Sequence, residues 1–214
     1  MKYCLSFMLL LAVNLLAVAQ TFQPDLHNLK LWDVTGRNVS ATTENGKKVI
    51  QFSEAESDGY MLLKDYKFSN GTIEFDVKGR NVPQQSFVGA AFHATEDKKY
   101  EVIYFRPFNF MNPDTVRRPR SVQYVFMPDY PWDKLRADSP GKYESKVNPV
   151  PNPDDWFHVK ITVQGKLIRV YVNNSAKPSL EVESLNENRT GRIGFWAGVT
   201  SNGSFANLKI TPAM

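Results

Sequence analysis

Beyond Gln20, apolar and polar residues alternate with a period of two in short runs that turn residues separate. In the run 72–78, Ile73, Phe75 and Val77 share one face of a strand, and the charged residues between them share the other. No amphipathic helical stretch of useful length accompanies these runs. The pattern therefore predicts an all-β chain.

The alternation recurs along the whole chain, and Asn45-Gly46 separates its first two runs. This dipeptide favours the positive φ angles of a tight hairpin turn. Many short strands without a helix are typical of β-sandwiches and jelly rolls. The runs that we interpret as strands are 39–43, 48–52, 72–78, 87–93, 100–106, 121–127, 157–164, 166–172, 193–199 and 205–210.

The N-terminal segment has the pattern of a secretory signal peptide, with Lys2, an apolar run to Val18 and small residues before Gln20. We expect residues 1–19 to be removed, and residues 20–214 to form a single exported domain, periplasmic or extracellular. The apolar run is too short for a membrane span, so no membrane insertion is expected. The sole cysteine, Cys4, would leave with the signal peptide, so no disulfide or cysteine metal site is expected.

The charges do not indicate a nucleic-acid partner, because a net charge of +4 is spread over 26 basic and 22 acidic side chains. The three histidines, His27, His93 and His158, are scattered, and no spacing matches a zinc or calcium loop. Glycine-rich phosphate-binding motifs are also absent. We therefore expect no metal and no cofactor.

The stretch 100–132 joins two expected strands through an excursion rich in proline, arginine and aromatic residues. Nine of the 13 prolines fall between Pro107 and Pro153. Long loops in a compact domain are uncommon unless they bind something or are disordered, and disordered segments contain few aromatic residues. The composition therefore predicts an ordered loop that covers part of the surface.

Several segments together resemble the concanavalin A-like lectin/glucanase superfamily: GTIEFDVKG, SFVGAAFHA, KKYEVIYFRPFNF, SVQYVFM, WFHVKITVQGKLIRVYVNN, GRIGFWAG and GSFANLKI. The resemblance covers about residues 39–211. Within the superfamily the chain most resembles bacterial envelope domains described as 3-keto-disaccharide hydrolases. This resemblance implies a jelly-roll sandwich of two curved antiparallel sheets, with a carbohydrate on the concave sheet and its rim loops.

Sugars present hydroxyl groups and apolar C–H faces, and the stretch 100–132 contains side chains that suit both. Planar aromatic rings can cover the C–H faces, and amide and guanidinium groups can bind the hydroxyls. For Tyr104 and Tyr124, packing in the core is the alternative. The predicted ligand-binding residues are Tyr104, Arg106, Asn109, Arg120, Gln123, Tyr124, Tyr130 and Trp132.

A 3-keto glycoside has an acidified C2–H, so elimination of the C1 substituent needs one base and one group that stabilises the enolate. Glu101 or His93 is the predicted base, and Arg106 or Arg120 is the predicted stabilising group. Glu101 and Arg106 are five residues apart, so a regular strand places them on opposite faces. A β-bulge would change that placement.

Glu74 and Asp76 resemble part of the β-glucanase signature, in which one strand presents three acidic residues at alternate positions. Lys78 occupies the third position here, so the two-carboxylate retaining mechanism lacks a member. A solvated outer face of a sheet also explains this alternation.

Three hypotheses follow for the function. The favoured one is a carbohydrate-recognising domain that binds a glycan on its concave face and rim loops. The second is an enzyme that cleaves 3-keto glycosides by elimination or hydrolysis. The third is a structural or adhesive sandwich that binds protein. The oligomeric state stays open.

Overall fold

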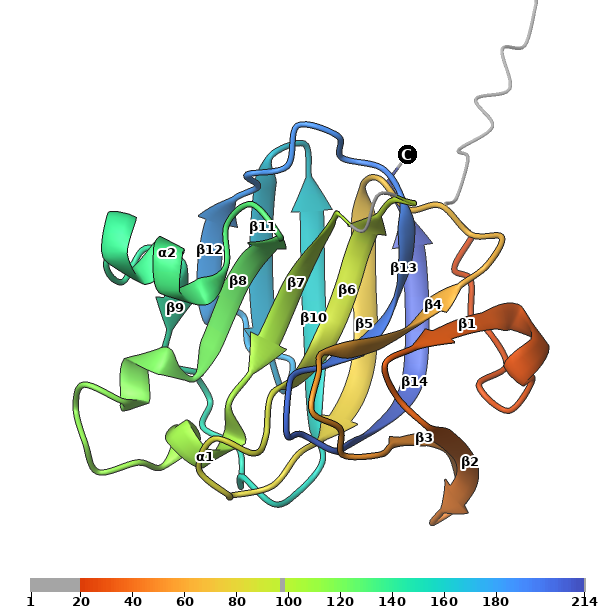
Figure 1. Ribbon diagram of the computed structural model, residues 1–214, viewed down its shortest axis with the longest axis horizontal. Coiled ribbons are helices and arrows are strands. Elements are labelled where there is room, and N and C mark those ends of the chain that lie inside the picture. The colour runs from red at the N-terminus through yellow and green to blue at the C-terminus, as the bar shows by residue number, and fades with distance from the viewer. Residues whose placement is uncertain (1–19, 97–98, 214) are drawn as a thin grey trace, which may run out of the picture.

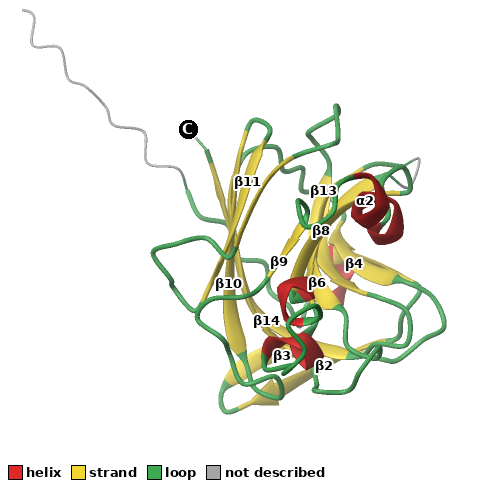
Figure 2. Ribbon diagram, turned by 90° about the vertical axis from the view of Figure 1, so that its left-hand side faces the viewer, coloured by secondary structure: helices red, strands yellow, loops and turns green. Residues whose placement is uncertain are grey.

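The computed structural model describes residues 20–96 and 99–213, and in these residues two antiparallel sheets of seven strands face each other (Figures 1 and 2). The all-β sandwich prediction is confirmed. The front sheet, nearest the viewer in Figure 1, has the strand order β1 (Trp32–Thr35), β4 (Gly59–Leu63), β13 (Arg192–Ala197), β6 (Val88–Ala94), β7 (Tyr100–Phe105), β8 (Val122–Met127) and β9 (Glu144–Ser145). The back sheet has the order β12 (Leu180–Glu183), β11 (Leu167–Val172), β10 (Phe157–Gln164), β5 (Gly71–Lys78), β14 (Gly203–Pro212), β3 (Lys47–Phe52) and β2 (Val39–Glu44).

All ten runs interpreted as strands are strands, with bounds that differ by a few residues at most. Asn45 and Gly46 form the expected hairpin turn between β2 and β3, with φ angles of 51° and 77°. The alternation did not predict four strands, β1, β4, β9 and β12. Three of these contain four residues or fewer, and β4 is an almost continuous apolar run that is buried on both faces.

Aromatic residues from both sheets form the core between them. Phe105 of the front sheet packs edge-on against Phe157 of the back sheet, with ring centroids 5.1 Å apart. Phe195 of the front sheet contacts both Phe75 and Phe205 of the back sheet. Because these residues are buried, the sandwich needs no disulfide for its core.

Two connections around β8 cover one side of the front sheet. The chain from β7 to β8 forms helix α1 (Pro107–Phe110) and the 3-10 helix η2 (Arg118–Arg120), and helix α2 (Trp132–Asp138) follows β8. A further 3-10 helix, η1 (Leu29–Leu31), precedes β1. Figure 1 shows α2 and the β7–β8 connection on the left of the front sheet, where they raise a rim. The expected ordered loop is thus partly helical.

The predicted signal peptide, residues 1–19, lies outside the described residues, so this prediction and the domain boundary at residue 20 stay predictions. Within residues 20–96 and 99–213, no helix has the length and apolar character needed to cross a membrane.

Candidate functional site

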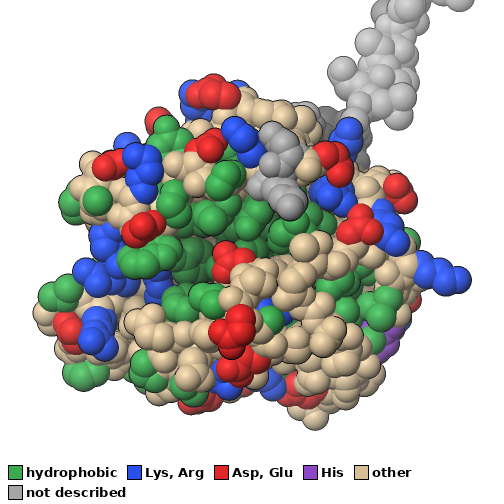
Figure 3. All heavy atoms as spheres, in the orientation of Figure 1, with side chains coloured by type: hydrophobic (Ala, Val, Ile, Leu, Met, Phe, Trp, Pro, Cys, Tyr) green, Lys and Arg blue, Asp and Glu red, His purple; other side chains and the backbone are tan. Residues whose placement is uncertain are grey.

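A cavity of about 620 Å³ lies on the outward face of the front sheet. Its floor comes from β7, β8 and β13, and its rim comes from α2 and from the loops before β4 and β6 and after β7 and β13. Figure 3 shows this face hollowed, with hydrophobic side chains in the hollow and Lys or Arg side chains at its left-hand edge. We call this space the front-sheet cavity.

Strand parity determines which side chains reach the cavity. Phe105 faces the back sheet, so Tyr104 faces outward, and the register pairs Tyr104 with Gln123 on β8. Arg106, two residues after Tyr104, also faces outward. Its Nη2 donates hydrogen bonds to the Tyr104 hydroxyl and to Gln123 Oε1, both at 2.6 Å. The Tyr104 hydroxyl in turn donates to Gln123 Oε1 at 3.1 Å. We call these three residues the outward network.

Arg106 is held almost out of solvent, with 6% of its surface exposed. Its Nη1 donates to the backbone carbonyl of Arg120, which also accepts a hydrogen bond from Asn109 Nδ2. Burial lowers the pKa of the Arg106 guanidinium. Burial likewise raises the pKa of Tyr104 to about 12, so this hydroxyl keeps its proton at ordinary pH. Because Tyr104 and Gln123 are uncharged, the outward network has a net positive charge, which is that of the Arg106 guanidinium.

Aromatic rings give the cavity its apolar surface. Trp196 of β13 lies against Tyr104, with ring centroids 5.2 Å apart, and Phe87 meets Tyr104 edge-on at 6.1 Å. Trp132, the first residue of α2, stands at the rim with 49% of its surface exposed, and the Arg136 guanidinium lies 4.8 Å from its ring centre. An exposed tryptophan beside a guanidinium offers an apolar face together with hydrogen-bond donors.

Asp58 is the one carboxylate among the residues described as lining the cavity. Its Oδ1 accepts a hydrogen bond from the Val199 backbone N–H at 2.9 Å. Burial raises the pKa of Asp58 despite this hydrogen bond. A carboxylate with a raised pKa is a better proton acceptor than an ordinary surface aspartate.

The structure brings five of the eight predicted ligand-binding residues into the cavity lining: Tyr104, Arg106, Asn109, Arg120 and Trp132. Gln123 lies beneath the lining, 1% exposed, and holds Tyr104 and Arg106. Tyr130 lies outside the lining, because its ring stacks on Phe126, whose position on β8 has the opposite parity to Gln123. Gln123 therefore contacts two lining residues from below, and Tyr130 lies outside the lining.

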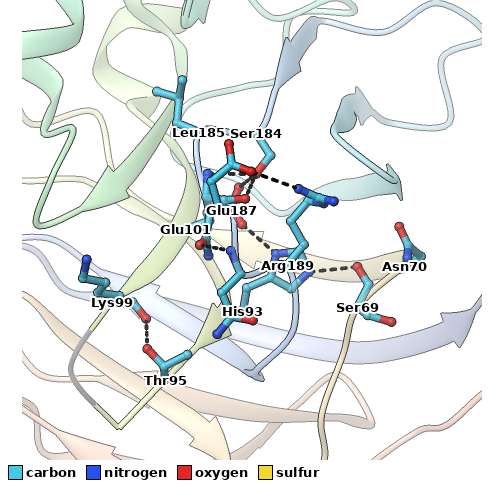
Figure 4. A network of polar contacts seen from close by, with 12 residues as sticks. Ser69, Asn70, His93, Thr95, Lys99, Glu101, Ser184, Leu185, Glu187 and Arg189 are labelled. Atoms are coloured by element: carbon cyan, nitrogen blue, oxygen red, sulfur yellow. Dashed lines mark hydrogen bonds and ion pairs between the residues drawn. The ribbon is translucent and has the colours of Figure 1, made fainter.

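The other three predicted residues, Glu101, His93 and Tyr124, have no exposed surface and lie between the two sheets. Figure 4 shows Glu101 and His93 in this buried network. Glu101 Oε1 accepts hydrogen bonds from the hydroxyls of Tyr124 and Ser184, both at 2.7 Å, and Glu101 Oε2 lies 2.6 Å from His93 Nδ1. We call these four residues the inward network.

Protonation of the inward network follows from its partners. His93 Nε2 lies 2.8 Å from the Ser69 carbonyl oxygen, which has no hydrogen, so Nε2 carries a proton and donates it. One further proton is shared between His93 Nδ1 and Glu101 Oε2. The pair is neutral in sum, whichever atom holds that proton. Every polar atom of the two side chains therefore has a partner.

A β-bulge brings His93 to Glu101. The register between β6 and β13 shifts near this point, and His93 has a φ of 52°, which is unusual for a residue other than glycine. Phe92 faces Glu101 across the ladder, so a regular strand would have pointed His93 outward. A bulge that would place Glu101 and Arg106 on one face was the alternative open from the sequence; the observed bulge joins His93 to Glu101 instead.

These placements bear on three of the predicted site residues. Glu101 and His93 are enclosed between the sheets, so in this conformation a sugar cannot reach the predicted bases. The Tyr124 hydroxyl donates a hydrogen bond to Glu101, and its ring presents no face to the cavity. Glu101 and Arg106 lie on opposite faces of the front sheet, as their five-residue spacing on a regular strand predicts.

Sequence reasoning missed several lining residues, among them Asp58, Phe87, Arg136 and Trp196. Arg136 lies four residues after Trp132, which is the spacing of neighbours on a helix, but a seven-residue helix is too short to give a clear periodic signal. Trp196 was inside an expected strand, and only the strand's pairing with β4 and β6 shows that it faces the cavity.

Glu74 and Asp76, the partial glucanase signature, lie on the outer face of the back sheet. Asp76 accepts hydrogen bonds there from Lys47, His158 and Asn207. No group of three or more metal-ligating side chains suited to an ion occurs in the described part of the chain.

Comparison with known families gives one match that spans nearly the whole described chain. The family of 3-keto-alpha-glucoside-1,2-lyase-like domains matches residues 22–211. The chain belongs to this family. A search of curated protein sequences finds no match. The resemblance inferred from the strand segments is therefore confirmed at the level of the family.

Solved structures with the same fold are distant in sequence. The carbohydrate-binding module CBM66 from Bacillus subtilis has a TM-score of 0.62 at 14% identity, over 88% of this chain and 100% of that one. A β-glucanase from Bacillus licheniformis has a TM-score of 0.57 at 14% identity, over 93% and 100%. The VIP36 exoplasmic/lumenal domain, in a form with Ca²⁺ and Man3GlcNAc bound, has a TM-score of 0.56 at 11% identity, over 88% of this chain and 86% of that one. These similarities confirm the concanavalin A-like fold.

Proposed function

We propose that this family member is an exported carbohydrate-binding domain that holds a glycan in the front-sheet cavity. The observation that carries the proposal is the combination of aromatic faces with buried hydrogen-bond donors in a space of about 620 Å³. A volume of that size lies within the range of ligand pockets, roughly 300–1,000 Å³. Trp132 and Trp196 offer ring faces for sugar C–H groups, and the arginines offer donors for hydroxyls.

The comparisons support the ligand class. CBM66 is a carbohydrate-binding module, and the VIP36 domain was solved with an oligosaccharide. The predicted signal peptide supports export to the periplasm or the extracellular space, where polysaccharides are accessible.

The test compares two tryptophans in a glycan-binding assay, by retention on a glycan array followed by calorimetry of the best ligand. We expect Trp132→Ala to weaken binding by at least about tenfold, because it removes the exposed ring at the rim. The matched control is Trp156→Ala: Trp156 lies beside Lys47 and Lys78 of the back sheet, away from the cavity. Equal losses in both variants, or no retained glycan, would refute the proposal.

The family match favours a second candidate, an enzyme that cleaves 3-keto glycosides by elimination. A base would take the C2 proton, and the C3 oxygen would carry the enolate charge. The C1–O bond would then break with its electron pair leaving on the aglycone oxygen, which takes a proton from water, while the C3 ketone re-forms and a C1–C2 double bond is made. Because Glu101 and His93 are enclosed, Asp58 is the available base in the cavity, and its raised pKa suits that role. The neighbouring guanidinium groups would stabilise the enolate.

Product analysis after incubation with a 3-keto disaccharide tests this candidate. Asp58→Asn should abolish turnover, while its amide oxygen can still accept the hydrogen bond from Val199. An unchanged 3-keto disaccharide with the wild-type protein would exclude the enzymatic candidate and leave the binding proposal intact.

A further inference from the structure

The cavity has an excess of positive charge. Among its described lining residues, four are arginines, Arg106, Arg117, Arg120 and Arg136, and one is an acid, Asp58. Neutral sugars need donors and acceptors but no net charge, so this imbalance exceeds what hydroxyl recognition requires. The excess of positive charge in the lining therefore bears on the charge of the ligand.

The carboxylates that neutralise these arginines are few. Glu144 pairs with Arg136 at 2.6 Å and reaches Arg120 only at 3.7 Å, so one acid serves two guanidinium groups. Arg117 forms an ion pair with Asp114 at 3.4 Å, and both side chains are exposed. Glu144 and Asp114 thus leave the inner end of the cavity, at Arg106, without a carboxylate.

Arg106 is the central residue of this inference, because its charge is buried and its described contacts are with uncharged groups. The guanidinium carbon lies 5.7 Å from the ring centre of Phe87 and 4.8 Å from that of Tyr104. The hydrogen-bond partners of Arg106 are the Tyr104 hydroxyl, Gln123 Oε1 and the Arg120 carbonyl, and none of the described carboxylates lies within ion-pair distance. Of the guanidinium's five N–H groups, these bonds use three, and the other two have no described partner. A buried charge without a counter-charge is unfavourable unless a ligand supplies one.

We propose that the glycan held in the front-sheet cavity carries an anionic group, either a uronic acid carboxylate or a sulfate ester, which binds at Arg106 and Arg120. This inference rests on the proposed binding function and specifies its ligand. Guanidinium groups make strong charge-assisted hydrogen bonds to both kinds of oxyanion. The anionic group would supply the counter-charge that Arg106 lacks, and Trp132 would cover the adjoining sugar ring.

A glycan array with matched pairs tests the inference: each oligosaccharide is presented as the neutral form, as the uronic acid form and as the 6-O-sulfate. We expect one or both acidic forms to bind about tenfold or more tighter than the neutral form. Raising the salt to about 0.5 M NaCl should reduce this difference, because salt screens partly exposed charges. The two acidic arms identify which oxyanion the cavity takes.

Arginine variants locate the effect. Arg120→Gln should lower the affinity for the acidic form by about tenfold and the affinity for the neutral form by a smaller factor, so that most of the preference for the acidic form is lost. The fold should persist, because the contacts to Arg106 and Asn109 come from the Arg120 backbone carbonyl. Arg169→Gln is the matched control: Arg169 lies on the back sheet, its side chain is 32% exposed against 35% for Arg120, and each has a carboxylate partner.

The outcomes separate the two proposals. Equal binding of neutral and acidic forms would overturn the anionic ligand and leave glycan binding in place. An acidic preference that Arg169→Gln reduces as much as Arg120→Gln would also overturn it, because the effect would come from net charge alone. Failure of every glycan to bind would overturn the proposed function, and this inference with it.

Discussion

The two faces of strand β7 carry two polar networks that differ in one respect. The inward network joins Glu101 to His93, Tyr124 and Ser184 between the sheets, and the outward network joins Arg106 to Tyr104 and Gln123 beneath the cavity. Both are buried and hydrogen-bonded. The inward network is neutral in sum, however, and the outward network holds a cation without a carboxylate.

This difference shows how a buried polar group can be assigned a role. The carboxyl group of Glu101 makes three hydrogen bonds with side chains and has no surface that a ligand could reach. Such a closed network specifies how the two sheets pack. Arg106 lies at a cavity, and among the described residues two of its N–H groups have no partner and no carboxylate lies within ion-pair distance; these properties support the proposal that it binds a ligand.

The largest expected effect comes from opening the inward network. Glu101→Ala should lower the free energy of unfolding by about 3–5 kcal/mol, because it leaves His93, Tyr124 and Ser184 without their acceptor inside the sandwich. Urea denaturation at neutral pH measures this change. A loss below about 1 kcal/mol would show that the inward network does not stabilise the fold.

Glu101→Gln sharpens the same comparison. The amide oxygen can keep the hydrogen bonds from Tyr124 and Ser184, so we expect a smaller loss of stability than for Glu101→Ala. If Glu101→Gln folded as the wild type but lost activity toward a 3-keto disaccharide, the assignment of Glu101 to structure would be wrong.

An intermediate effect is expected from giving the outward network the carboxylate it lacks. Gln123→Glu places an anion where Gln123 Oε1 now accepts from Arg106 at 2.6 Å. The internal ion pair should lower affinity for acidic glycans by about tenfold, or ~1.4 kcal/mol, and leave neutral glycans little affected. Calorimetry with one matched pair measures both. Retained affinity for the acidic form would mean that Arg106 does not bind the anion.

The smallest effect should come from a partly exposed cluster on the outer face of the back sheet, which provides a baseline for both buried networks. The hydrogen bond to Asp76 raises the pKa of His158. For Asp76, burial raises the pKa, but hydrogen bonds from His158, Lys47 and Asn207 outweigh burial and lower it to about 2.

The two pKa shifts limit stabilisation of the fold at opposite ends of the pH range. Stabilisation from His158 is fully present below about pH 6.5, the pKa of an unfolded histidine, and is lost as pH rises through the raised value. Stabilisation from Asp76 is present above its unfolded pKa of 3.8 and is lost as pH falls toward about 2. His158→Gln should therefore cost less than about 1 kcal/mol near pH 5 and even less near pH 8.5. Urea denaturation at both pH values checks this order, and a larger cost at the higher pH would contradict it.

The sequence by itself determined the sandwich and the faces of its strands. Alternation depends only on which residues are apolar, so ten strands could be predicted, and the five-residue separation of Glu101 and Arg106 correctly placed them on opposite faces. The same alternation did not predict β4, because both faces of that strand are buried and its apolar run is nearly continuous.

The tertiary structure decided which of those faces is closed and which is open. The bulge at His93 is a local change in register, and the contact of Trp196 with Tyr104 depends on the pairing of segments distant in sequence. Burial and charge compensation are properties of a side chain's neighbours. For that reason Glu101, a candidate base in the sequence, became a structural residue, and Arg106, one donor among several, became the centre of the candidate site.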